Sequence, residues 1–147
     1  MTIRKKAALV LAPLALLACV QSAAAATIEV VKSPYCGCCN QWIEYLRHEG
    51  FEVRVTESED VTPAARRLGV PDALRSCHTA SVDGYAVEGH VPAEDIRRLL
   101  ADRPDAAGIA VPGMPIGSPG MEQGDARQAY ETILFGRDGR RQVFARH

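Results

Sequence analysis

TIEVVKSPYCGCCNQWIEYLRHEG, residues 27–50, is the stretch that decides the fold. Its first six residues are mostly β-branched and end before a Ser-Pro pair, which predicts a strand. From residue 40 to residue 49 the apolar side chains recur at helical spacing, and this predicts an amphipathic helix that Gly50 ends. A cluster of three cysteines at 36–39 therefore lies where a strand passes into a helix.

Five further elements are predicted downstream. The patterns indicate a strand, a short helix, two strands joined by an Asp-Gly turn and a last helix. They are expected at residues 51–56, 62–68, 77–82, 85–89 and 92–101. The resulting order, β-α-β-α-β-β-α, is typical of a thioredoxin-like domain, so the predicted fold class is α/β.

The composition changes after the last predicted helix. Residues 108–120 are rich in proline and glycine, and we expect no regular element there. Strand character returns at 130–135 and 142–145, on either side of an Asp-Gly pair that predicts a hairpin. The chain is thus expected to contain a thioredoxin-like domain at 27–104 and a C-terminal extension, a Pro/Gly-rich loop plus a β-hairpin, at 105–147.

Residues 1–26 have the features of a secretory signal peptide. A basic start is followed by an apolar run at 7–20 and by four alanines, with cleavage expected before Thr27. The run is too short for a membrane span, which argues against an uncleaved anchor. Lipoprotein processing at Cys19 is a second alternative, since LLAC resembles a lipobox, but the alanines fit ordinary cleavage better. We therefore expect a periplasmic protein without a membrane span.

Length, composition and charge limit the class of protein. A chain of 147 residues with 47% hydrophobic and 24% charged residues is expected to form one globular unit. Its net charge is -1, and removal of the signal takes away three of 17 basic residues and no acidic ones, leaving -4. This charge lacks the basic character of a nucleic-acid-binding protein. In an exported, oxidising compartment, thiols tend to be oxidised or metal-bound.

The cysteine cluster contains two spacings at once. Cys36 and Cys39 form a CxxC pair at a helix start, where the helix dipole and free amides favour thiolate. Cys38 adds a third sulfur that a redox dithiol does not need. Crowded thiolates suit a soft ion such as Cu(I), whereas zinc usually takes two spaced pairs. A structural disulfide is the alternative in an exported protein, although three thiols within four residues fit it poorly.

Five residues outside the cluster are candidate partners. Cys77 is either the disulfide partner of the odd thiol or a fourth metal ligand, since the third strand is expected beside the start of the first helix. His78 and His90 can bind metal through imidazole, although a histidine at a strand end is more often a hydrogen-bonded structural residue. Met114 and Met121 lie in the Pro/Gly-rich segment and are either packing residues or thioether ligands for Cu(I).

Four short motifs follow one another along the chain. They are YCGCC at 35–39, SCHTA at 76–80, GY with EGHVP within 84–92, and AVPGMP with GSPGME within 110–122. Together they resemble the CopG copper-resistance family of bacterial envelope proteins, which is recognised by a CxCC motif. The resemblance covers essentially all of residues 27–147, and the order of four motifs makes it more specific than the CxCC motif alone.

The resemblance implies a thioredoxin-like domain whose C-terminal extension helps to bind metal, and a copper cluster bridged by cysteine sulfur. It also implies a role in interconverting Cu(I) and Cu(II) alongside a periplasmic copper efflux system. Carried over to this chain, the metal ligands are six sulfur-bearing side chains, Cys36, Cys38, Cys39, Cys77, Met114 and Met121.

Three functions are compatible with these residues. The first is a monomeric copper-binding protein that also acts as a copper/thiol oxidoreductase, with Cys36 and Cys39 as its catalytic pair. The second is a thiol–disulfide oxidoreductase acting on proteins, with Cys36 attacking and Cys39 resolving. Against it, Cys77 stands near the place where thioredoxins carry a substrate-presenting cis-proline. The third is a non-catalytic copper store or carrier.

Overall fold

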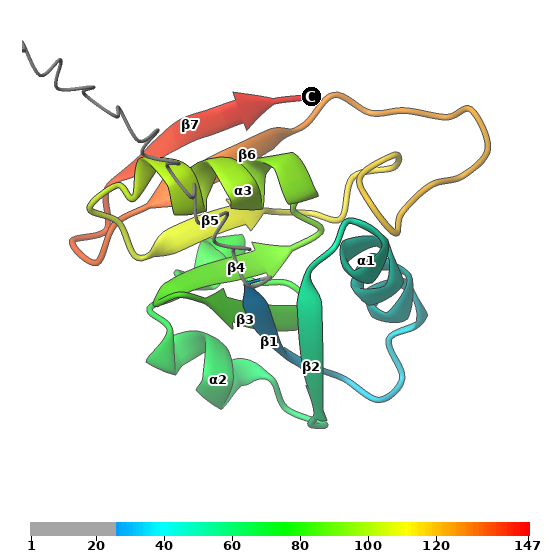
Figure 1. The fold of residues 1–147 in the computed structure, drawn as a ribbon, viewed down its shortest axis with the longest axis horizontal. Helices are drawn as coiled ribbons and strands as arrows, with labels where there is room; N and C mark the ends of the chain where they lie inside the picture. The colour runs from blue at the N-terminus through cyan, green and yellow to red at the C-terminus, as the bar shows by residue number, and fades with distance from the viewer. Residues whose placement is uncertain (1–25) are drawn as a thin grey trace, which may run out of the picture.

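Seven strands form one mixed sheet in the computed structural model, which describes residues 26–147 (Figure 1). The predicted signal peptide and Cys19 lie outside the described residues, apart from Ala26. Along the sheet the strand order is β2-β1-β3-β4-β5-β6-β7. The elements are β1 (Thr27–Lys32), α1 (Gly37–His48), β2 (Glu52–Glu57), α2 (Thr62–Arg67), a 3-10 turn (Asp72–Leu74), β3 (His78–Val82), β4 (Tyr85–Gly89), α3 (Ala93–Asp102), β5 (Gly108–Val111), β6 (Glu131–Phe135) and β7 (Arg141–Arg146).

The elements predicted up to α3 are all present and in the predicted order. Strand β1 pairs in parallel with β2 and antiparallel with β3, and β3 pairs antiparallel with β4. Asp83 and Gly84 both have positive φ, as a two-residue turn of the predicted kind requires. The predicted C-terminal strands form the antiparallel pair β6–β7.

The prediction that residues 108–120 contain no regular element was wrong at its start. Gly108–Val111 is the four-residue strand β5, which pairs in parallel with β4 and antiparallel with β6. Every residue of β5 is buried, and a Cβ at Gly108 would collide with the backbone of Ala86. The short apolar run GIAV was overlooked because proline and glycine dominate the residues that follow it. Residues 112–130, here called the C-terminal loop, have no named helix or strand.

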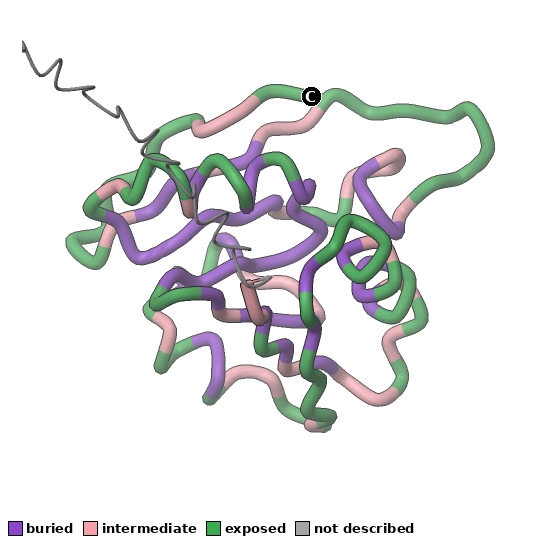
Figure 2. The backbone as a smooth tube through the Cα atoms, viewed as in Figure 1, coloured by how far each residue is buried: buried purple, intermediate pink, exposed green. Residues whose placement is uncertain are grey.

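The sheet is covered by helices on both faces, so its central strands are buried throughout (Figure 2). Successive strand residues point to opposite faces. Val87 and Ile109 pack in one hydrophobic cluster with Trp42 of α1 and Ile96 of α3. The adjacent residues of β4 and β5, which face the other way, pack in a second cluster with Ala65 of α2. Helices α1 and α3 therefore share one face, and α2 covers the other.

Buried polar contacts hold α1 in place. The indole Nε1 of Trp42 donates to the carbonyl of Val91 at 2.9 Å, and the backbone N–H of Ala93 donates to the hydroxyl of Tyr45 at 3.0 Å. Val91 lies in the connection from β4 to α3, and Ala93 is the first residue of α3. These bonds fix the orientation of α1, whose first turn carries the cysteine cluster.

The C-terminal loop passes beside α1 (Figure 1). Gly120 has a φ of 82°, and a Cβ there would lie 2.7 Å from the backbone N of Trp42 and 3.0 Å from the carbonyl O of Cys38. Only glycine therefore permits this approach. The loop is held against the first turn of α1, although it is distant from that turn in sequence.

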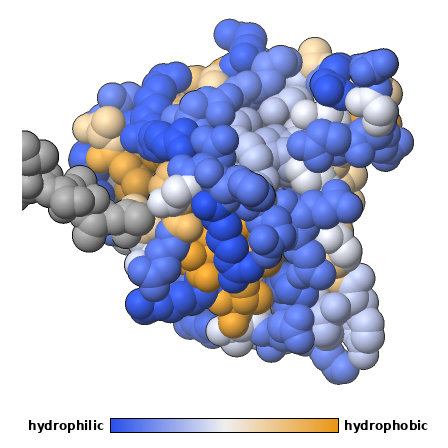
Figure 3. Space-filling model, turned by 45° about the vertical axis from the view of Figure 1, so that its right-hand side comes forward, coloured by the Kyte–Doolittle hydropathy of each residue, from blue (hydrophilic) through white to orange (hydrophobic). Residues whose placement is uncertain are grey.

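The surface shown in Figure 3 is mostly hydrophilic, with smaller hydrophobic patches among the charged residues. Tyr35 and Met114 are two of the large hydrophobic residues that remain exposed, at 83% and 42%. None of the helices in the described part of the chain combines the length and apolarity that a membrane span requires.

Candidate metal centre

The first turn of α1 brings two of the cysteines together. Cys36 is the N-cap residue, and its sulfur accepts a hydrogen bond from the backbone N–H of Cys39 at 3.3 Å. Residues three apart on a helix lie on the same face. Cys36 and Cys39 are accordingly joined by a disulfide, with their Cα atoms 5.4 Å apart.

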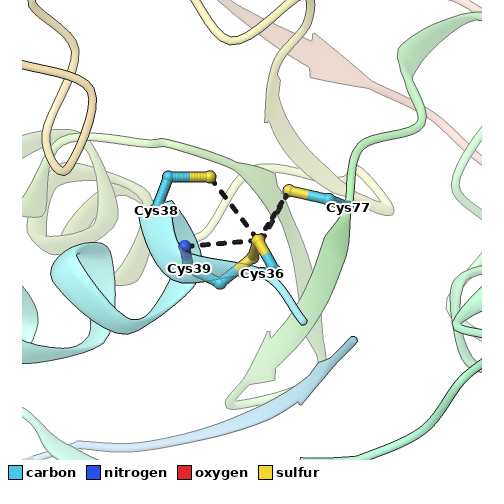
Figure 4. Close-up of side chains that lie close together, drawn as sticks. All are labelled: Cys36, Cys38, Cys39 and Cys77. Carbon is cyan, nitrogen blue, oxygen red and sulfur yellow. Dashed lines mark hydrogen bonds between the residues drawn. A yellow bond between two sulfur atoms is a disulfide. The ribbon is translucent and has the colours of Figure 1, made fainter. Parts of the chain in front are cut away.

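The pairing of β1 with β3 delivers the fourth cysteine. Lys32, the last residue of β1, is opposite His78, the first residue of β3. Cys77 therefore lies just beyond the end of β1, where the chain turns into α1. Its Sγ is 3.2 Å from that of Cys36 and 3.3 Å from that of Cys39 (Figure 4).

All four cysteine sulfurs form one group. They lie within 4.8 Å of one another, and Cys38 Sγ is 3.5 Å from Cys36 Sγ. Cys39 is fully buried, whereas Cys38 and Cys77 are partly exposed free thiols. Burial raises the pKa of the Cys77 thiol, an effect that a hydrogen bond from Ser76 partly offsets. A bound cation would have to displace the proton of Cys77.

The C-terminal loop brings one of the two methionines to this group. The Sδ of Met114 lies 3.8 Å from the Sγ of Cys77. Met114 also has a positive φ of 46°, a backbone conformation that non-glycine residues rarely adopt. Met121 is partly buried in the turn after Gly120, and among the described residues no hydrogen-bond-length contact joins its thioether to a cysteine.

Both histidines considered from the sequence are close to Cys77 and fully buried. One ring nitrogen of His78, one of His90 and the Cys77 sulfur lie within 4.8 Å of one another. The His78 ring packs against Trp42, with centroids 4.5 Å apart, and edge-on against His90 at 5.1 Å. The structure thus places a second group of donor atoms beside the cysteines.

Glu88 is a residue of the site that sequence reasoning did not single out. Its side chain is fully buried in β4, and its Oε1 accepts a hydrogen bond of 2.6 Å from the backbone N–H of Ser76. Burial raises the pKa of Glu88 to about 7, despite the lowering effects of the hydrogen bond from Ser76 and of the charge on Arg75. Glu88 therefore holds the segment that carries Cys77. A charged residue inside an otherwise apolar predicted strand was the available signal.

These donors fit a soft metal ion. Four cysteine sulfurs and a thioether, with imidazole nitrogens beside them, match the preferences of Cu(I). The disulfide form has two free thiols in the described chain, whereas reduction of Cys36 and Cys39 makes all four sulfurs available. The arrangement can thus change its number of sulfur ligands with its oxidation state.

Two of three comparisons with known proteins find relatives of this chain. A family model described as "Protein of unknown function, DUF411" matches residues 74–121. No curated protein matches the chain.

Two solved structures are similar, both described as copper resistance protein copG. Form 2 has a TM-score of 0.80 and 46% identity over 84% of this chain and 98% of that one. Form 1 has a TM-score of 0.78 and 47% identity over 82% and 96%. The chain therefore belongs to the CopG copper resistance protein family.

Proposed function

We propose that this protein binds copper through its four clustered cysteines and exchanges electrons with it through Cys36 and Cys39. The observation that carries the proposal is the joint position of a disulfide-bonded pair and two further thiols within 4.8 Å. A dithiol enzyme needs only the pair. The extra sulfurs of Cys38 and Cys77 are explained if copper is the substrate.

The redox step balances with two copper ions. Two Cu(II) ions each accept one electron, while the thiolates of Cys36 and Cys39 lose two electrons as their S–S bond forms. Any protons on these thiols pass to solvent. The Cu(I) product is the softer ion, and the remaining thiols and the Met114 thioether are suited to hold it.

The proposal also covers the fold class and the cellular location of the protein. The pairing of β2-β1-β3-β4, with α1 and α3 on one face and α2 on the other, supports a thioredoxin-like domain. The C-terminal extension, 105–147, would then add strands to its sheet and Met114 to its site. Export to the periplasm by cleavage of residues 1–26 and delivery of Cu(I) to an efflux system complete the proposal.

Electron paramagnetic resonance tests the redox step. We expect anaerobic Cu(II) to lose its signal when mixed with the reduced protein, with one disulfide formed for every two ions reduced. Peptide mapping should locate that disulfide between Cys36 and Cys39. C39S is expected to slow the reaction, while H48Q, an exposed change on α1, should leave it unchanged. Persistence of the Cu(II) signal in the presence of the reduced protein would rule the redox step out.

A protein thiol–disulfide oxidoreductase is the second candidate, and the Cys36–Cys39 disulfide at a helix start favours it. This function requires access of a polypeptide to Cys36, but the Cys77 sulfur lies 3.2 Å away. Insulin reduction separates the two candidates. A copper protein should show little insulin reductase activity, whereas activity that is unaffected by C38S and M114L would favour a protein substrate. A copper store would show neither activity.

A further inference from the structure

A second group of donor atoms shares Cys77 with the four-cysteine cluster. The Cys77 sulfur and one ring nitrogen each of His78 and His90 lie within 4.8 Å of one another. The antiparallel register of β3 and β4 pairs Thr79 with Glu88, and its continuation places His90 opposite Cys77. The backbone therefore brings one thiol and two imidazoles together at the end of this strand pair.

Backbone carbonyls fix which nitrogen of each imidazole carries hydrogen. His78 donates from Nε2 to the carbonyl of Gly89 at 3.0 Å, and His90 donates from Nδ1 to the carbonyl of Pro119 at 2.8 Å. A neutral imidazole has a single N–H, so Nδ1 of His78 and Nε2 of His90 retain free lone pairs. Metal-binding histidines are commonly oriented in this way.

The free nitrogen of His90 has no hydrogen-bond partner among the described residues, although the side chain is fully buried. A buried polar atom left without a partner is destabilising, and it points to a ligand. Nδ1 of His78 is 3.9 Å from Cys77 Sγ.

We infer that Cys77, His78 and His90 form a second copper site, which holds one ion while Cys36 and Cys39 are joined as a disulfide. The disulfide removes two sulfurs from the four-cysteine cluster but leaves Cys77 a free thiol. Met114 adds a thioether 3.8 Å from the Cys77 sulfur. Two imidazoles, one thiolate and a weak thioether accommodate copper in both oxidation states. The choice of copper rests on the proposed function, whereas the nitrogen and sulfur donor set rests on the geometry.

The test adds one equivalent of Cu(I) anaerobically to protein in which the disulfide is intact. X-ray absorption at the copper edge then distinguishes nitrogen from sulfur neighbours. We expect two nitrogen neighbours in the wild type. The H90Q variant keeps an amide N–H for the Pro119 carbonyl but loses the imidazole. It should lose one nitrogen neighbour and bind Cu(I) about tenfold more weakly. H48Q removes an exposed histidine and should match the wild type.

The reduced proteins provide the fold control and separate the two claims. Reduced H90Q should still take up Cu(I) at its four cysteines, which shows that the variant is folded. Copper bound by sulfur alone in the disulfide form, or an H90Q variant indistinguishable from H48Q, would overturn the inference. Failure of the reduced wild type to bind Cu(I) would instead overturn the proposed function, and nitrogen coordination in the disulfide form would still support the second site.

Discussion

Glu88 has a carboxyl side chain that is buried away from the water its charged form prefers. It is fully buried, it accepts one hydrogen bond from Ser76, and its second oxygen has no partner among the described residues. Burial raises its pKa to about 7. Between about pH 4.5 and about pH 7, Glu88 therefore keeps its proton in the folded protein but releases it in the unfolded chain. The contribution of Glu88 to the free energy of unfolding is lost as the pH rises through that interval.

Replacing Glu88 with glutamine should remove this pH dependence. We compare the free energy of unfolding of E88Q with that of the wild type at pH 5 and at pH 8. The difference should shift in favour of E88Q by on the order of 3 kcal/mol as the pH rises, because the wild type must ionise a buried carboxyl. Urea denaturation at the two pH values measures the difference. E59Q, at an exposed position, should show no such gain. An equal gap between E88Q and wild type at both pH values would contradict the explanation.

The two methionines of the C-terminal loop allow a matched comparison. Met114 contacts the Cys77 sulfur, whereas Met121 has no such contact in the structure. We expect M114L to weaken Cu(I) binding by roughly three- to tenfold, since a thioether is a weak ligand. M121L should stay within about twofold of the wild type. Competition with a chromophoric Cu(I) chelator measures both. Equal losses would show that Met121 joins the ligand set, as the family resemblance implies.

At the scale of elements, the C-terminal loop depends on a glycine where it meets α1. Gly120 and Gly124 both have positive φ, but only Gly120 has neighbours within 4 Å of an added Cβ. We expect G124A to lower the free energy of unfolding by about 1 kcal/mol, from the left-handed backbone alone. G120A should cost about 2–4 kcal/mol, because it also displaces the loop from α1. Thermal and urea denaturation compare them, and equal losses would show that the contact with Trp42 is unimportant.

Elements defined by their own side-chain pattern could be predicted from the sequence. Strand β1, helix α1 and the Asp83-Gly84 turn follow from alternation, helical spacing and turn residues. Strand β5 could not be, because its apolar run of four residues is short and leads directly into residues rich in proline and glycine. The approach of His90 to Cys77 depends on strand register, and that of Gly120 to α1 depends on tertiary packing. Local sequence determines neither contact.

For the whole molecule, the single sheet joins the predicted domain and the predicted extension. Strand β5 is buried between β4 and β6, and Ile109 and Phe135 are each fully buried in different hydrophobic clusters. We expect a chain of residues 27–104 to lose cooperative unfolding, since removal of β5–β7 exposes β4 and both clusters. Urea denaturation followed by circular dichroism tests this. A sharp transition with the stability of the intact chain would show that 27–104 is an independent domain.

The most direct test of the central claim is an anaerobic Cu(I) titration of the fully reduced protein. Four sulfurs within 4.8 Å predict that each chain binds at least one copper ion. Cys38 is a thiol that a redox pair does not need, so we expect it to serve as a copper ligand. The C38S variant should therefore bind Cu(I) with clearly lower affinity. H48Q, an exposed change on α1, is the matched control. Uptake of less than one copper per chain, or the same affinity in C38S as in the wild type, would contradict the account.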